Sequence, residues 1–162
     1  MNIKIVLSIL LLIVSLKAQE GYLNIDAKHF EADEQKGFMN FKGDVKMTKN
    51  KDILLCQNLV ILTESSKGKK DKAIPKSYEA TGDVSFTLHT KDNILKGSGD
   101  KVFYYPNEQK YIIIGNGYLE DTKEGKKLTA KTIYIDELTG RTNIDGDGDK
   151  PVKFRLKLDE NK

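Results

Sequence analysis

The chain of 162 residues contains one cysteine, three prolines and no tryptophan. A single cysteine excludes an internal disulfide, so a hydrophobic core and backbone hydrogen bonds must hold the fold together. No stretch after residue 20 keeps the apolar period of a helix, which excludes a helical bundle. The net charge of +3 is small and spread along the chain, so nothing indicates a nucleic-acid-binding protein.

Recognisable catalytic and metal-binding motifs are also absent from the sequence. It has no Gly-x-Ser-x-Gly motif, no phosphate-binding loop and no paired zinc motif. His29 and His89 lie on separate segments at outward-facing phases, and a metal site would need further ligands. Residues 145–149 resemble the start of a calcium loop, but Lys150 replaces its sixth-position glycine. We therefore expect no catalytic residues, no metal and no cofactor.

The first 18 residues have the pattern of a secretory signal peptide. Residues 1–4 are short and basic, and residues 5–16 form an apolar run that is short for a membrane span. Cleavage after Ala18 would release a mature domain of residues 19–162 into an exported compartment. An N-terminal anchor that is never cleaved is the alternative.

An internal repeat organises the rest of the chain. A Gly-Asp or Gly-Asn turn between alternating apolar residues occurs at Gly43, Gly82 and Gly115, and a degenerate copy occurs at Gly146. Turns of this kind between segments of period two are typical of β-strands. The repeat therefore predicts an all-β protein.

A second repeated unit, centred on a small residue, precedes each turn. The four small residues are Ala27, Cys56, Gly99 and Ala130. Three of them lie 16 positions before the next turn glycine, whereas Cys56 lies 26 positions before Gly82. The ten extra residues indicate an insertion at about residues 63–76. Its place in the repeat predicts that Cys56 is a packed small side chain and not a reactive thiol.

The apolar phase changes after each small residue, which indicates that a strand bends there and passes from one sheet to another. The predicted architecture is two antiparallel sheets that face each other in a jelly-roll-like, V-shaped sandwich. Gly97, Gly99 and Gly117 are expected to leave space beside large inward side chains. The first strand (residues 25–32) and the last (residues 152–158) are expected to leave open edges, to which another chain could add a strand.

Several of these features together resemble the LptA/OstA family of lipopolysaccharide-transport proteins. They are the signal peptide, an Ala-x-x-Phe-x-Ala-Asp opening, the recurring Gly-Asp-Val turn and a Val-x-Tyr-Tyr strand, and the resemblance covers residues 24–158. It implies an open, V-shaped β-jellyroll in the periplasm that shields the acyl chains of lipid A between the inner and outer membranes. It also implies edge-strand pairing with LptC-like inner-membrane and LptD-like outer-membrane partners, and head-to-tail homo-oligomers.

The ligand-contact residues that the resemblance implies are the inward-facing apolar ones. They are Phe41, Val45, Met47, Val84, Phe86, Leu88, Ile113, Leu119, Ile133 and Ile135. The family has no catalytic residues to carry over. The insertion at residues 63–76 departs from the family pattern and bears on the length of one loop and on the groove mouth, but not on the repeat.

Three other interpretations remain open at this point. An enzyme on a parallel β-helix would need clustered carboxylates or basic residues on one face, and these are not evident. A membrane-anchored LptC-like relative would retain residues 5–16 as its anchor. A closed sandwich with a dry core would be an interaction module, and its core would use the same residue types as a lipid-binding groove.

Overall fold

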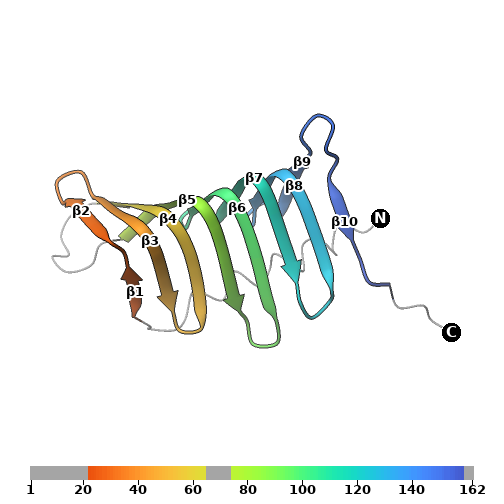
Figure 1. Cartoon of the computed structure of the whole chain (residues 1–162), viewed down its shortest axis with the longest axis horizontal. Coiled ribbons are helices and arrows are strands. Elements are labelled where there is room, and N and C mark those ends of the chain that lie inside the picture. The colour runs from red at the N-terminus through yellow and green to blue at the C-terminus, as the bar shows by residue number, and fades with distance from the viewer. Residues whose placement is uncertain (1–21, 65–73, 159–162) are drawn as a thin grey trace.

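The computed structural model describes residues 22–64 and 74–158. They form ten strands: β1 (Leu23–Asp26), β2 (His29–Asp33), β3 (Phe38–Lys49), β4 (Asp52–Glu64), β5 (Ile74–His89), β6 (Ile94–Tyr105), β7 (Lys110–Asp121), β8 (Lys126–Asp136), β9 (Arg141–Asp145) and β10 (Lys153–Arg155). The strands lie side by side along the long axis, with β1 and β2 at one end and β9 and β10 at the other (Figure 1). Within these residues no helix is long and apolar enough to span a bilayer.

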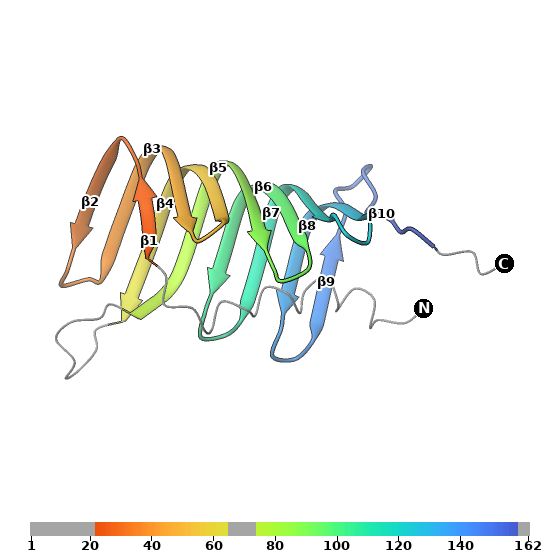
Figure 2. The same ribbon diagram turned by 90° about the horizontal axis from the view of Figure 1, so that it is seen from below.

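Each long strand is bent and contributes to two layers (Figure 2). The layer that ends in β2 and β9, here sheet A, also contains residues 38–42, 58–64, 74–81, 101–105, 110–114 and 132–136. The layer that ends in β1 and β10, here sheet B, also contains residues 45–49, 52–56, 84–89, 94–99, 117–121 and 126–130. All pairs are antiparallel, which confirms the predicted architecture.

The bends coincide with the repeated Gly-Asx turns. Gly43, Gly82 and Gly115 have φ angles of 82°, 81° and 78°, and the residue after each also has a positive φ. Glycine adopts this region freely, and Asp or Asn tolerates it better than other residues do. The pairing register shifts at the same places, as in a β-bulge. The repeated motif therefore bends the strand from sheet A into sheet B.

The same glycines leave room for a side chain of the neighbouring segment. A Cβ added at Gly43 would lie 3.0 Å from the Cβ of Lys28, and one at Gly82 would lie 2.8 Å from the Cβ of Gln57. At Gly115, Asp100 occupies that space. The corner positions thus require glycine for two reasons, its backbone conformation and its lack of a side chain.

The predicted end strands differ from the observed ones. The single strand expected over residues 25–32 is split into β1 and β2, with the break at Ala27 and Lys28, and the strand expected over residues 152–158 is reduced to β10. The degenerate turn at Gly146 lies in the connection between β9 and β10, so this last copy no longer bends a continuous strand. An end strand has one neighbour, so a corner there lacks the support that inner strands receive from both sides.

Strands β4 and β5 extend into both ends of the predicted insertion. Residues 63 and 64 belong to β4 and residues 74–76 belong to β5, where Thr63 pairs with Pro75. The remaining residues 65–73, like the signal-peptide prediction for residues 1–18, lie outside the described residues.

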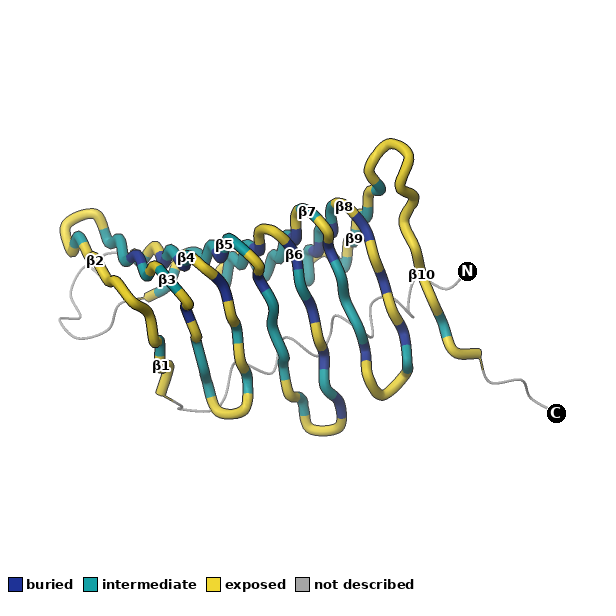
Figure 3. Tube along the Cα trace, viewed as in Figure 1, coloured by how far each residue is buried: buried dark blue, intermediate teal, exposed yellow. Residues whose placement is uncertain are grey.

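Burial alternates along the strands, as the period-two pattern requires (Figure 3). The buried core lies between the two sheets and comprises Val45, Cys56, Leu59, Ile61, Ala80, Val84, Val102, Ile113, Leu128, Ala130, Ile133 and Ile135. Burying each large aliphatic side chain contributes about 1.5–3 kcal/mol. Cys56 is 3% exposed, and burial raises the pKa of its thiol to about 11, which confirms its role as a packed small side chain.

Candidate functional site

The inner faces of both sheets carry continuous rows of apolar residues across eight strands. In sheet A the register aligns Phe30, Phe41, Leu59, Ala80, Val102, Ile113, Ile133 and Ile144. In sheet B it aligns Ile25, Met47, Leu54, Phe86, Gly97, Leu119, Leu128 and Phe154. An apolar surface therefore runs from one end of the molecule to the other.

Nine of the ten predicted site residues belong to this interior. Five are buried in the core, namely Val45, Val84, Ile113, Ile133 and Ile135, each at most 2% exposed. Four are partly buried and pack against the core, namely Phe41, Met47, Phe86 and Leu119. Leu88 lies apart from this cluster, near the end of β5, where it is paired with the buried Leu95.

The inner surface of the sandwich retains solvent-accessible apolar area. Phe86 and Leu119 face inward in the middle of sheet B, yet both are only partly buried. Phe41 in sheet A and Met47 in sheet B are in the same state. Two sheets in full face-to-face contact would bury such side chains. The arrangement can accommodate hydrocarbon against the exposed parts of these side chains.

The space expected beside three glycines is already filled by neighbouring side chains. A Cβ on Gly97 would lie 2.0 Å from Cζ of Phe86, and one on Gly99 would lie 2.6 Å from Cγ2 of Ile113. At Gly117 the nearest atoms are the carbonyl oxygen of Ala130, at 2.9 Å, and Cδ1 of Ile133. The expectation of open space there was wrong, because the bulky neighbours pack onto the bare backbone. The glycines position these side chains and do not form a cavity.

Three tyrosines, which the sequence reasoning missed as a site, form a stack on the inner face of sheet A. The ring centroids of Tyr78 and Tyr104 are 6.0 Å apart, and those of Tyr104 and Tyr111 are 4.4 Å apart. Burial raises the pKa of all three phenols. The alternation of the strands could have revealed the stack. Each tyrosine lies two positions from a core residue and therefore faces inward, as Tyr104 does beside Val102 and Tyr111 beside Ile113.

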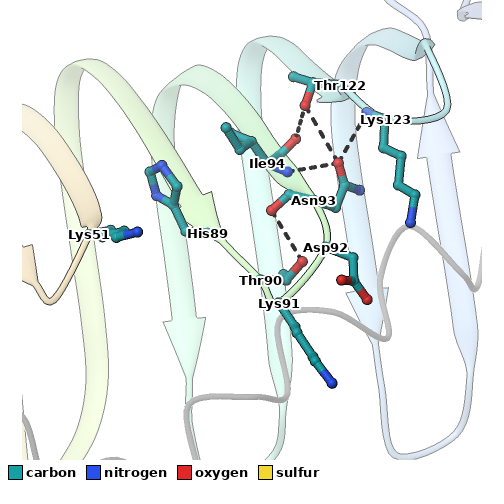
Figure 4. Close-up of a pocket in the computed structure, with 9 residues that line it drawn as sticks. All are labelled: Lys51, His89, Thr90, Lys91, Asp92, Asn93, Ile94, Thr122 and Lys123. Carbon is teal, nitrogen blue, oxygen red and sulfur yellow. Dashed lines mark hydrogen bonds between the residues drawn. The ribbon is translucent and has the colours of Figure 1, made fainter.

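A polar pocket of about 480 Å³ lies at the loops that end sheet B (Figure 4). Asn93 connects the two loops that form the pocket. Its side-chain oxygen accepts hydrogen bonds from the backbone amides of Ile94, at 2.7 Å, and Lys123, at 3.1 Å. Lys51, Lys91 and Lys123 line the pocket with a single carboxylate, that of Asp92. This excess of positive charge would attract anionic groups to that end of the molecule.

The described strands and loops contain no group of three or more His, Cys, Asp or Glu residues placed to hold a metal ion. His29 lies near Glu31, with a nitrogen–oxygen distance of 4.0 Å, and His89 lies near Asp52, at 3.7 Å, in a different part of the fold. The two histidines are therefore separate surface residues, as predicted.

Both ends of the sandwich present strand edges. Within the described residues β1 and β2 pair only with β3, and β9 and β10 pair only with β8. The side chains of β10 are all exposed, as are most of those of β2. Backbone groups on the outer side of these strands are available to a strand from another chain.

The fold and the family can be compared with known proteins. Among solved structures, the fold is similar to that of LptH from Pseudomonas aeruginosa, described as the LptA homologous periplasmic component of the conserved lipopolysaccharide transport device. The TM-score is 0.68 at 13% identity, over 86% of this chain and 97% of that one. No curated protein matches the chain by sequence. A family model described as LptA/(LptD N-terminal domain) LPS transport protein matches residues 24–141, from β1 to the first residue of β9, and the chain therefore belongs to this family.

Proposed function

We propose that this chain binds lipopolysaccharide between sheets A and B and shields its acyl chains while the lipid crosses the periplasm to the outer membrane. The observation that carries the proposal is the continuous apolar inner face, which stays partly exposed at Phe41, Met47, Phe86 and Leu119. This exposure favours a lipid-carrying interior over a dry interaction module. Family membership supports the same function.

The energetics fit a passive carrier. Burying a methylene group contributes about 0.8 kcal/mol, so an acyl chain exposed to water during transit would be strongly disfavoured. An apolar face that continues from one end strand to the other removes most of this cost along its whole length. The chain does not need a catalytic residue for this role, and we propose that it is not an enzyme.

The strand edges support a second part of the proposal, which concerns partners. One end of the sandwich, either β1 and β2 or β9 and β10, would pair with an LptC-like inner-membrane protein, and the other end with an LptD-like outer-membrane protein. Copies of this chain would pair with one another through the same edges. Head-to-tail pairing would join the apolar inner faces of successive domains. Such a bridge would let the lipid move between domains without meeting water.

The proposed location is the periplasm, reached by cleavage of the signal peptide at residues 1–18. Mass spectrometry of the exported protein should find an N-terminus near Gln19. An N-terminus at Met1 would instead favour a membrane-anchored, LptC-like protein.

Site-specific photocrosslinking tests lipid binding directly. A photoreactive residue at position 86 should form an adduct with lipopolysaccharide, whereas one at position 87 should not. Thr87 is the matched control because it follows Phe86 in the same strand and belongs to the opposite face, where it pairs with Ile53 and Lys96. A folded protein without an adduct at position 86 would contradict the proposal.

A further inference from the structure

The apolar interior contains one polar cluster that neither the repeat nor the apolar lining explains. The side-chain oxygens Oε1 of Glu137 and Oγ1 of Thr142 are buried and have no hydrogen-bond partner among the described residues. Both belong to the β8–β9 hairpin: Glu137 directly follows β8, and Thr142 lies on β9. Buried polar atoms are nearly always paired, so two unpaired oxygens in one hairpin call for a partner.

The register places Thr142 on the inner face of sheet A, and Glu137 lies close by. Ile133 and Ile135 are core residues of β8, and Glu137 is the first residue of the turn after it, with Oε1 buried. Thr142 is paired with Ile135, which is paired in turn with Tyr111. Thr142 and the tyrosine stack therefore belong to one row, at the edge of the interior away from the bends.

The phenols of Tyr104 and Tyr111 belong to the same cluster. The two residues are paired across β6 and β7, and their rings stack. The backbone amide of Glu137 donates a hydrogen bond to the carbonyl oxygen of Gln109, at 3.1 Å, so Glu137 lies beside the β6–β7 turn, two residues before Tyr111. Burial chiefly raises the pKa of both phenols, and the charge of Glu137 adds to this. Strands β6, β7 and β9 and the turn after β8 thus each place one oxygen-bearing side chain at this edge of sheet A.

The chemistry of the cluster indicates which ligand groups it would accept. Burial alone accounts for the raised pKa of Glu137, with no contribution from a neighbouring cation. A site without a cation offers an anionic phosphate no opposite charge to pair with. Hydroxyl and amide groups, which both donate and accept hydrogen bonds, complement a carboxyl, a threonine hydroxyl and phenols.

We propose that Glu137 and Thr142, together with Tyr104 and Tyr111, form a polar subsite that hydrogen-bonds hydroxyl or amide groups on the acyl chains of the carried lipid. The inference rests on the proposed function, since the ligand enters the same interior. The subsite would fix the depth and direction of the lipid, while the apolar rows hold its hydrocarbon without selecting a position.

Substitutions that remove or keep the polar atoms test the subsite. Thr142→Val and Glu137→Leu remove the polar atoms and should each weaken binding of purified lipopolysaccharide about tenfold. Thr142→Ser and Glu137→Gln keep hydrogen-bonding groups and should change it less than twofold. Thr132→Val is the matched control, because Thr132 lies on the same strand as Ile133 but faces outward. Binding of dimyristoylphosphatidylcholine, whose chains lack hydroxyl and amide groups, should be unchanged in all variants.

A second measurement needs no substitution. The unaltered chain should bind N-(3-hydroxydodecanoyl)glucosamine about fivefold more tightly than N-dodecanoylglucosamine, which lacks one hydroxyl group. Equal affinities for this pair, or full lipopolysaccharide affinity in Thr142→Val and Glu137→Leu, would overturn the subsite and indicate that water alone satisfies the two oxygens. If position 86 still crosslinks lipopolysaccharide, the transport function stands while the subsite fails; loss of that crosslink in the unaltered background would refute the function itself.

Discussion

The ring of Phe86 lies against the backbone of Gly97, its partner across β5 and β6, with no room for a side chain between them. The contact is so close that an added Cβ would lie 2.0 Å from Cζ of the ring. Gly97 is buried, whereas Phe86 is only partly buried. The ring therefore packs directly on the backbone of the glycine in sheet B. The other part of the ring remains accessible from the interior, where a ligand would contact it.

Gly97→Ala should prevent the ring of Phe86 from packing on the backbone at position 97. The methyl group would displace the ring into the interior, and overpacking of this kind lowers the free energy of unfolding by about 1–3 kcal/mol. Chemical denaturation measures the loss, and the displaced ring should also weaken lipopolysaccharide binding. Ser98→Ala, at the next position on the outer face, is the control and should change stability by less than about 0.5 kcal/mol. Equal stability of the Gly97→Ala protein would argue against the observed packing.

A charge at the same place tests the apolar lining. Phe86→Asp puts a carboxylate among hydrocarbon side chains, and it should weaken lipopolysaccharide binding at least tenfold and lower the free energy of unfolding by about 2 kcal/mol. Thr87→Asp adds the same charge to the outer face of the same strand. It should leave binding within twofold of the unaltered chain in the same titration. Comparable losses in both variants would mean that the effect is electrostatic and not specific to the interior.

Much of this fold follows from local rules that the sequence displays. Gly43, Gly82 and Gly115 could be predicted as bends because only a few residue types adopt a positive φ without strain. The inward set could be predicted because alternation is a geometric property of any strand. Both rules depend only on residues that are close in the chain, so the bends and the inward-facing residues can be predicted from the sequence pattern.

Other features depend on contacts between distant segments, and the pattern did not reveal them. In the sequence, Gly97 suggests open space beside the strand, and only the structure shows that the ring of Phe86 fills it. The first strand breaks at Ala27 because an end strand pairs with one neighbour only, and this neighbour relation is not visible in the sequence. Glu137 and Thr142 look like ordinary turn and strand residues, and only the surrounding structure leaves their oxygens buried and unpaired. The candidate subsite was therefore unpredictable from the sequence, whereas most of the apolar lining was predictable.

The corner glycines give a test of the repeat itself. Gly82→Ala places a side chain at φ 81° and against Gln57, whose Cβ would be 2.8 Å away. Strain at a positive φ costs about 1–2 kcal/mol, and the contact adds to it, so the thermal midpoint should fall by several degrees. Asp83→Asn, at the next residue, keeps a side chain that tolerates this region and should have little effect. A stable Gly82→Ala protein would show that the bend does not need glycine.

Glu137 should make stability depend on pH. Burial raises the pKa of its carboxyl from 4.5 to about 7, so the folded state holds the proton more tightly than the unfolded chain. The contribution of this carboxyl group to the free energy of unfolding therefore falls as the pH rises from about 4.5 to about 7. Glu137→Gln should be more stable than the unaltered chain by about 1 kcal/mol at pH 8, allowing for its partial exposure, and nearly equal at pH 4. Glu34→Gln in an exposed turn is the control, and a constant difference across the pH range for Glu137→Gln would refute the assignment.

The C-terminal edge offers the test of assembly. β10 pairs with β8 over three residues only, Lys153–Arg155, so its removal should cost little stability while it takes away the sheet B edge at that end. Deleting residues 152–162 should therefore reduce head-to-tail self-association, measured by sedimentation velocity over a concentration series, without abolishing the crosslink at position 86. Deleting residues 159–162 is the matched truncation, because it leaves β10 intact, and it should associate normally. If both truncations associate like the full chain, this edge takes no part in assembly, and pairing would have to use β9 or the opposite end of the sandwich.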